Sequence, residues 1–281
     1  MSVADPLVSV DWLVTNLADE NIRVLDATWV APFLTGRRSG AEAYTAGHIP
    51  GAAYFDIDLI ADQSSRLSHM LPPPEQFAAQ VGKLGINSQS VIVVYDSNGF
   101  FASARAWWMF RAMGHEAVWV LDGGFQAWQA AGGQIETSMA SIKTTDYQPL
   151  PRSEMVRDMA AMRAHVRAQD VTILDARDTG RFSGAAPEPR PDLPSGHMPG
   201  SVCIPASSLI TEDGRLKSPT ELEPLLSAHV DSLVVTTCGS GVSAAIISLA
   251  LARLGNFEAA LYDGSWSQWA AHPENPIELI S

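Results

Sequence analysis

The stretch Gly47-His48-Ile49-Pro50-Gly51-Ala52 returns later in the chain as Gly196-His197-Met198-Pro199-Gly200-Ser201. Upstream of each, Arg23-Val24-Leu25-Asp26-Ala27 returns as Thr172-Ile173-Leu174-Asp175-Ala176, and the Asp and His of each copy keep the same spacing. Two further blocks match in the same order, beginning at Val91 and Val118 in the first half and at Leu233 and Ala259 in the second. Four matching blocks in one order indicate a tandem duplication.

Each copy alternates short β-branched runs with longer apolar stretches. Strands that alternate with helices predict an α/β fold, in which a mostly parallel sheet is covered by helices. Aspartates that end such strands lie at the carboxyl edge, where these sheets usually place their sites. The expected strands are 22–25, 91–95, 117–121, 172–174, 233–237 and 259–262, and the expected helices are 102–112 and 242–254.

The chain has 281 residues, of which 46% are hydrophobic and 17% are charged. This length and composition suit two packed domains and exclude a largely disordered chain. We expect a first domain at 1–138, a linker at 139–153 and a second domain at 154–281. The linker mixes Ser, Thr, Lys, Asp and Pro without helical or strand periodicity.

The formal net charge is −13. Such an acidic chain is not expected to bind nucleic acid or an anionic membrane surface, since both need a basic patch. The first residues lack the basic and apolar regions of a signal peptide. The longest apolar run, 242–254, is interrupted by Ser248 and Arg253 and is too short to cross a bilayer. We therefore expect a cytoplasmic location.

The sharpest local feature is Thr237-Cys238-Gly239-Ser240-Gly241-Val242-Ser243-Ala244. A predicted buried strand runs into a glycine-rich turn and then into a helix. Such a turn points backbone N–H groups inward, and the helix N-terminus adds partial positive charge. Both should stabilise a thiolate at Cys238, which makes this residue the candidate nucleophile.

The two cysteines have different predicted roles. An intracellular Cys is usually a small buried hydrophobe, and Cys203 fits that description. Cys238 differs because its counterpart in the first copy is Asp96. A position that only packs in the core should not tolerate an exchange of thiol for acid.

Two other motifs compete for the same loop. The sequence Gly239-Ser240-Gly241-Val242-Ser243-Ala244 matches a dinucleotide-binding fingerprint, but too little chain follows Asp263 to complete that fold. A cysteine-dependent phosphatase would need an arginine where the loop has Ala244. Both interpretations fail. No His, Cys, Asp and Glu set has metal-ligand spacing, so no metal is expected.

Taken together, the repeated Gly-His-(Ile/Met)-Pro-Gly blocks, the Cys of the second copy and the late Asp-Gly-Ser-Trp segment resemble a tandem rhodanese-type sulfurtransferase. The loop from Cys238 to Ala244 is most similar to the 3-mercaptopyruvate branch, which usually has Cys-Gly-Ser-Gly-Val-Thr. Ser243 departs from that pattern but keeps the hydroxyl. Thiosulfate-specific relatives resemble Cys-Arg-Lys-Gly-Val-Thr, whereas Gly239 and Ser240 are neutral.

The resemblance implies roles for particular residues. Arg181 and Arg190 match arginines that bind the substrate, and a guanidinium fork suits the carboxylate and ketone of mercaptopyruvate. Asp58, His69 and Ser240 match a proposed hydrogen-bonded proton relay. The loop residues Gly239, Gly241, Val242 and Ser243 are expected to surround the sulfur. His48 and His197 occur in both copies, so we expect a shared structural role for them.

The implied function is transfer of sulfur from 3-mercaptopyruvate through a Cys238 persulfide to a thiol or cyanide, with release of pyruvate. No organic cofactor is required. The acceptor is expected to be a small thiol, a thioredoxin-like protein or cyanide. Thiosulfate:cyanide sulfurtransfer is the alternative activity, and a sulfur-carrier or regulatory rhodanese module is the non-enzymatic alternative.

Overall fold

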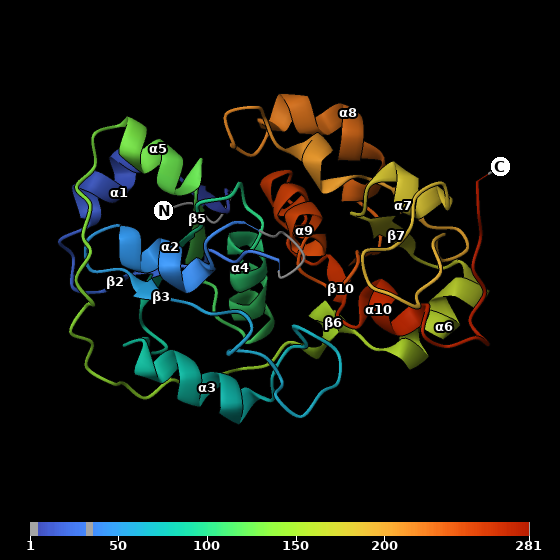
Figure 1. Ribbon diagram of the computed structural model, residues 1–281, viewed down its shortest axis with the longest axis horizontal. Helices are drawn as coiled ribbons and strands as arrows, with labels where there is room; N and C mark the ends of the chain where they lie inside the picture. Colours follow the sequence, from blue (N-terminus) through green and yellow to red (C-terminus); the bar gives the residue numbers. More distant parts are fainter. Residues whose placement is uncertain (1–4, 32–35, 281) are drawn as a thin grey trace. The chain divides into compact units, whose positions relative to one another are not determined.

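The computed structural model describes residues 5–31 and 36–280, which form two compact units (Figure 1). The first comprises Met1–Ser64, Leu71–Arg152 and Glu212–Leu216. The second comprises Ser65–Met70, Ser153–Thr211 and Lys217–Ser281. The stretch expected to be a linker is attached to the first unit, because the amides of Thr145 and Leu150 donate to the carbonyls of Gly82 and Met113, at 2.9 Å each.

The first unit contains a parallel sheet with strand order β1-β5-β4-β2-β3. Its strands are β1 (Leu7–Val8), β2 (Ile22–Asp26), β3 (Ala53–Tyr54), β4 (Val91–Tyr95) and β5 (Val118–Leu121). Its helices are α1 (Val10–Asn16), α2 (Gly40–Ala46), α3 (Pro74–Lys83), α4 (Ser103–Ala112) and α5 (Gly124–Ala130).

The second unit repeats this topology, with parallel strand order β6-β10-β9-β7-β8. Its strands are β6 (Val156–Arg157), β7 (Thr172–Asp175), β8 (Val202–Cys203), β9 (Val234–Thr237) and β10 (Ala260–Tyr262). Its α-helices are α6 (Met159–Ala168), α7 (Thr179–Ser183), α8 (Pro219–Val230), α9 (Ala244–Arg253) and α10 (Ser265–Trp269), and short 3₁₀ turns lie at Ser153–Met155 and Ala206–Leu209. The predicted duplicated α/β fold is confirmed.

Alternation along β9 shows how helices cover both faces of the second sheet. Val235 packs in a core cluster with Met162 of α6 and Trp266 of α10. The next residue, Thr236, hydrogen-bonds Ser248 of α9 at 3.0 Å. Successive side chains of a strand point to opposite faces, so α6 and α10 cover one face and α9 covers the other. No helix of the described residues is long and apolar enough to cross a membrane.

His48 and His197 make equivalent contacts in the two units. Each ring stacks on an aromatic side chain, His48 on Tyr44 at 3.9 Å and His197 on Phe182 at 4.0 Å. The Nδ1 atom of each lies 2.8–2.9 Å from the backbone carbonyl oxygen of that same aromatic residue. Both histidines also pair through their backbones with a distant segment. These contacts confirm the predicted shared structural role.

Corresponding loops follow β4 and β9 at the carboxyl edges of the two sheets. Gly99 and Gly241 occupy equivalent positions and have the same left-handed backbone, with φ of 79° and 77°. The loops diverge at the next residue, because Phe100 is also left-handed (φ 61°) and Val242 is not. The turn extends to Ser243, so α9 begins at Ala244, two residues later than the sequence pattern predicted.

Asp96 fills the loop of the first unit with its own carboxylate. That carboxylate accepts hydrogen bonds of 2.8–3.2 Å from the backbone amides of Asn98, Phe100, Ala102 and Ser103. The side chain is 2% exposed. The turn therefore binds a negative group at the position where the second copy has Cys238.

Replacement of Asp96 by Ala should destabilise the first unit, because it would leave several buried amides without an acceptor. Each such group costs about 1–3 kcal/mol, so we expect a loss of roughly 3 kcal/mol in thermal or urea unfolding of the full chain. Asp96→Asn keeps one carbonyl oxygen and should lose less. A change below about 0.5 kcal/mol for Asp96→Ala would contradict this account of the loop.

Candidate active site

Cys238 lies between the end of β9 and the start of α9 and is only 2% exposed. The start of α10 holds its loop in place. The Trp266 amide donates to the Cys238 carbonyl at 2.9 Å, and the Ser267 amide donates to the Gly239 carbonyl at 2.9 Å. The Ser267 hydroxyl donates to that same Gly239 carbonyl at 2.5 Å. The thiol is thus carried on a backbone fixed by a second element.

Ser265 has a left-handed backbone, with φ 49°, which is uncommon for a residue other than glycine. Its hydroxyl donates to the Tyr262 carbonyl at 2.8 Å and accepts from the Cys238 amide at 3.3 Å. No role for Ser265 was predicted from the sequence. The available signal was its counterpart Gly124 (φ 56°), since a glycine in a sister copy marks a position where φ is positive.

Both predicted substrate-binding arginines approach the Cys238 loop within the second unit. Arg181 belongs to α7, and Arg190 lies in the loop that follows. A β-carbon at position 239 would lie 3.0 Å from Nη2 of Arg181 and 3.1 Å from Nη1 of Arg190. Gly239 therefore lets both guanidinium groups come close to the backbone next to the thiol. The structure brings Arg181 and Arg190 to the Cys238 loop, and their binding of the substrate stays a prediction.

Glu188 orients the guanidinium of Arg181 through hydrogen bonds. Its buried carboxylate accepts from Nη2 of Arg181 at 2.6 Å and from Nε at 3.2 Å, which is a bidentate pair. The same carboxylate accepts from Nη1 of Arg177 at 2.8 Å. No role for Glu188 was predicted from the sequence. Its role depends on a contact with Arg177, for which the sequence gives no signal.

Arg177 is fully buried and organises this network. Its guanidinium donates to both carboxylate oxygens of Asp175 at 2.7–3.1 Å and to the Gly196 carbonyl at 2.7 Å. It also lies over the Trp266 ring, 4.1 Å from the centroid. Burial opposes the charge of Arg177, but Asp175 and Glu188 outweigh this effect and raise its pKa.

Two buried carboxylates, Asp175 and Glu188, pair with Arg177 and Arg181. The exposed Asp178 carboxylate also lies 3.8 Å from Nε of Arg181. Arg190 is half-buried and has no ion pair with a residue in the described part of the chain. Arg190 is therefore the arginine beside the Cys238 loop whose charge no carboxylate of the described residues pairs with.

The other predicted site residues lie in different parts of the chain. Ser240, Gly241, Val242 and Ser243 share the loop with Cys238, and the Ser240 and Val242 side chains are buried. Asp58 belongs to the first unit, where the Trp29 indole N–H donates to its carboxylate at 2.7 Å. Burial raises the pKa of Asp58 despite this hydrogen bond.

His69 is buried and left-handed, with φ 66°, and belongs to the segment Ser65–Met70 that packs with the second unit. It therefore shares a unit with Ser240, whereas Asp58 does not. The relay of Asp58, His69 and Ser240 stays a prediction.

Cys203 differs from Cys238 in its surroundings. Its thiol points to the Arg177 carbonyl oxygen at 3.6 Å. Burial and the nearby Asp175 carboxylate raise the pKa of this thiol, which disfavours the reactive thiolate. Within residues 5–31 and 36–280, no group of three or more His, Cys, Asp or Glu side chains could hold a metal ion.

Comparison with known proteins identifies relatives of nearly full length. Thiosulfate/3-mercaptopyruvate sulfurtransferase 2 of Arabidopsis thaliana is 40% identical over 99% of this chain and 87% of its own length. The 3-mercaptopyruvate sulfurtransferase of Escherichia coli K12 is 37% identical over 97% of this chain and 98% of its own.

The solved structure of SseA from Escherichia coli, described as a 3-mercaptopyruvate sulfotransferase with the rhodanese fold, matches with a TM-score of 0.84 and 35% identity. The match covers 93% of this chain and 99% of that one. The rhodanese-like domain family matches residues 9–131 and 158–272, one segment in each copy. The chain therefore belongs to the rhodanese family and carries two rhodanese-like domains in tandem.

Proposed function

We propose that this protein transfers sulfur from 3-mercaptopyruvate, through a persulfide on Cys238, to a thiol or cyanide, with release of pyruvate. The observation that carries the proposal is the approach of Arg181 and Arg190 to Gly239, beside the buried thiol. The names of the Arabidopsis and Escherichia coli relatives support the choice of donor.

The local charge favours a monocarboxylate donor. Two guanidinium groups can bind the carboxylate and ketone oxygens of mercaptopyruvate with charge-assisted hydrogen bonds. Because carboxylates pair with Arg177 and Arg181, the single charge of Arg190 is the one that a donor carboxylate can pair with. A dianion such as thiosulfate would be matched less well.

In the proposed step, the Cys238 thiolate attacks the sulfur of mercaptopyruvate. The new S–S bond forms as the S–C bond breaks, and the electron pair passes to carbon as the enolate of pyruvate. That enolate takes up the proton of the donor thiol, which leaves Cys238 as a persulfide anion. An acceptor thiol or cyanide then takes the outer sulfur and restores the Cys238 thiolate.

The first unit offers a physical analogue of the persulfide. A carboxylate oxygen of Asp96 is two bonds from the β-carbon, as the outer sulfur of a Cys238 persulfide would be. The Asp96 oxygens accept from inward-facing amides. We expect amides of the Cys238 loop and of the α9 N-terminus to accept the negative outer sulfur in the same manner.

Further parts of the proposal concern protons, partners and location. Ser240 would pass the proton, with His69 as the base and Asp58 as its orienting partner. A small thiol or a thioredoxin-like protein would be the physiological acceptor, and the cytoplasm the site of action. Thiosulfate is the competing donor, since the name of the Arabidopsis relative includes both substrates.

Replacement of Cys238 by Ser should abolish pyruvate release from mercaptopyruvate, because the hydroxyl cannot form a persulfide. Cys203→Ser is the matched control and should keep activity within about twofold. Comparing kcat/KM for mercaptopyruvate and thiosulfate, with cyanide as the acceptor, identifies the preferred donor. Pyruvate release by Cys238→Ser would overturn the mechanism, and absence of turnover in the native chain would favour a sulfur-carrier module.

Replacement of Glu188 by Gln should change donor preference. The variant loses the carboxylate that orients Arg181 and gains one net positive charge at the loop. We expect kcat/KM for mercaptopyruvate to fall by about tenfold or more, the range of one charge-assisted hydrogen bond, and the thiosulfate-to-mercaptopyruvate ratio to rise.

Asp178→Asn is the control for Glu188→Gln. It removes an exposed carboxylate whose oxygen lies 3.8 Å from Nε of Arg181, while an Asn can still cap α7. This control should change the ratio by less than about twofold. An unchanged ratio in Glu188→Gln would refute the role of Glu188.

A further inference from the structure

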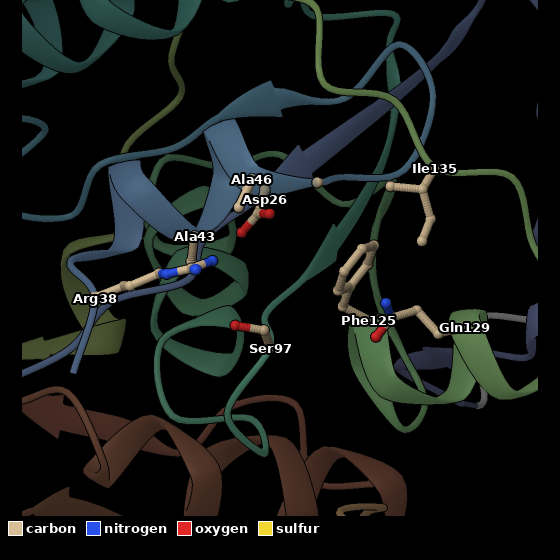
Figure 2. Close-up of a pocket in the computed structure, with 9 residues that line it drawn as sticks. Asp26, Arg38, Ala43, Ala46, Ser97, Phe125, Gln129 and Ile135 are labelled. Carbon is tan, nitrogen blue, oxygen red and sulfur yellow. The ribbon is translucent and has the colours of Figure 1, made fainter.

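The first unit has a pocket of about 300 Å³ at the carboxyl edge of its sheet (Figure 2). Asp26, Arg38 and Ser97 line one side, and Phe125, Gln129 and Ile135 line the other (Figure 2). A pocket with an apolar wall and a few polar groups is typical of a small-molecule site. Its volume is at the lower end of the range for such sites.

Three residues that line the pocket have counterparts in the second unit, and these counterparts surround a bound side chain there. Asp26 corresponds to Asp175, and in each copy the carboxylate accepts from the amide two residues later, at 2.8 and 3.0 Å. Phe125 corresponds to Trp266. The Phe125 amide donates to the Asp96 carbonyl and the Trp266 amide to the Cys238 carbonyl, at 2.9 Å each.

Gly47 corresponds to Gly196 in the repeated Gly-His block. A β-carbon on either glycine would lie within 2.8 Å of the Cγ2 atom of the equivalent isoleucine, Ile135 or Ile277. The walls around the two positions are therefore built alike.

In the second unit, Arg177 contacts all three counterparts. Its guanidinium pairs with Asp175, donates to the Gly196 carbonyl and lies over Trp266. The first unit has Thr28 at the position of Arg177. It therefore keeps the acid, the glycine and the aromatic ring, all of which line the pocket, but lacks the guanidinium that they surround.

Asp26 lacks the cationic partner that Asp175 has. It is 2% exposed, and no ion pair joins it to the described residues. Burial and the nearby Asp96 carboxylate raise the pKa of Asp26. A cation placed against Asp26 would relieve both effects.

Arg38 gives the pocket a second recognition group of opposite charge. Its side chain lines the pocket and forms no ion pair with a carboxylate in the described part of the chain. The Ser97 hydroxyl lies on the same side (Figure 2). A ligand with only a cation would be repelled by Arg38, whereas a ligand that also carries a carboxylate would pair with it.

We propose that this pocket binds a small guanidino acid, with its guanidinium between Asp26 and the Phe125 ring and its carboxylate at Arg38. A guanidinium over an aromatic face is favourable, and its planar fork fits a carboxylate. Asp26 is the one acidic residue among the described residues that line the pocket, so the bound guanidinium has one carboxylate partner there rather than two. This proposal does not depend on the sulfur-transfer chemistry.

The test is calorimetric titration of the full chain with three probes of similar length. L-Arginine carries both charged groups, agmatine lacks the carboxylate, and L-citrulline replaces the guanidinium by a neutral urea. We expect L-arginine to bind, and each of the other two probes to bind at least about tenfold more weakly. Equal binding of L-citrulline would overturn the guanidinium assignment, and equal binding of agmatine would overturn the role of Arg38.

Variants locate the binding site. Asp26→Asn should weaken L-arginine binding at least about tenfold, and Thr28→Arg should abolish it by filling the pocket with a tethered guanidinium. Glu20→Gln removes an exposed carboxylate elsewhere in the first unit and should leave binding within about twofold. If Thr28→Arg does not fold, Asp26→Asn and the three probes still show whether the pocket binds a guanidino acid. No binding of L-arginine, or unchanged binding in Asp26→Asn, would overturn the proposal.

Discussion

The structure depends on holding a negative group at the turn between a central strand and the following helix. In a chain with a formal net charge of −13, long-range attraction cannot hold such a group. Backbone amides of the turn do so locally, as the hydrogen bonds to the Asp96 carboxylate show. The second copy has the thiol of Cys238 at the same position, and the proposed persulfide would take the place of this carboxylate.

Arg177 accounts for the clearest difference between the two copies. In the second unit it neutralises Asp175, orients Glu188 and stacks on Trp266, and Glu188 in turn presents Arg181 to the Cys238 loop. In the first unit Thr28 takes its place, and a pocket lies between the corresponding acid and ring. The exchange of Arg177 for Thr28 thus distinguishes the network of arginines and carboxylates in the second unit from the pocket in the first.

The sequence alone was sufficient for the fold and the centre of the candidate site. Repeated blocks and β-branched runs predicted the duplicated parallel sheets, because buried strands leave a strong local pattern. The Cys238 loop was found through its motif, and the two arginines through the resemblance to rhodanese-type sulfurtransferases. The start of α9 was placed two residues early, since Val242 and Ser243 are apolar or neutral and do not show that the turn continues through them.

Glu188 and Ser265 were missed because their roles arise from tertiary contacts. Glu188 acts through Arg177 and Arg181, which meet it only in the folded unit. Ser265 acts through a left-handed backbone, and a serine in the sequence does not indicate that conformation. Comparison of the copies would have revealed this conformation, because Gly124 has it in the first unit. The glycine at the equivalent position of the first copy was therefore the overlooked signal for Ser265.

The central claim is that Cys238 carries the transferred sulfur. Intact-mass measurement of the full chain after brief treatment with 3-mercaptopyruvate, without acceptor, tests this most directly. The account predicts a gain of one sulfur atom that a reducing thiol or cyanide removes, that Cys203→Ser keeps and that Cys238→Ser loses. A mass that does not change in the native chain, or a gain that persists in Cys238→Ser, would contradict it.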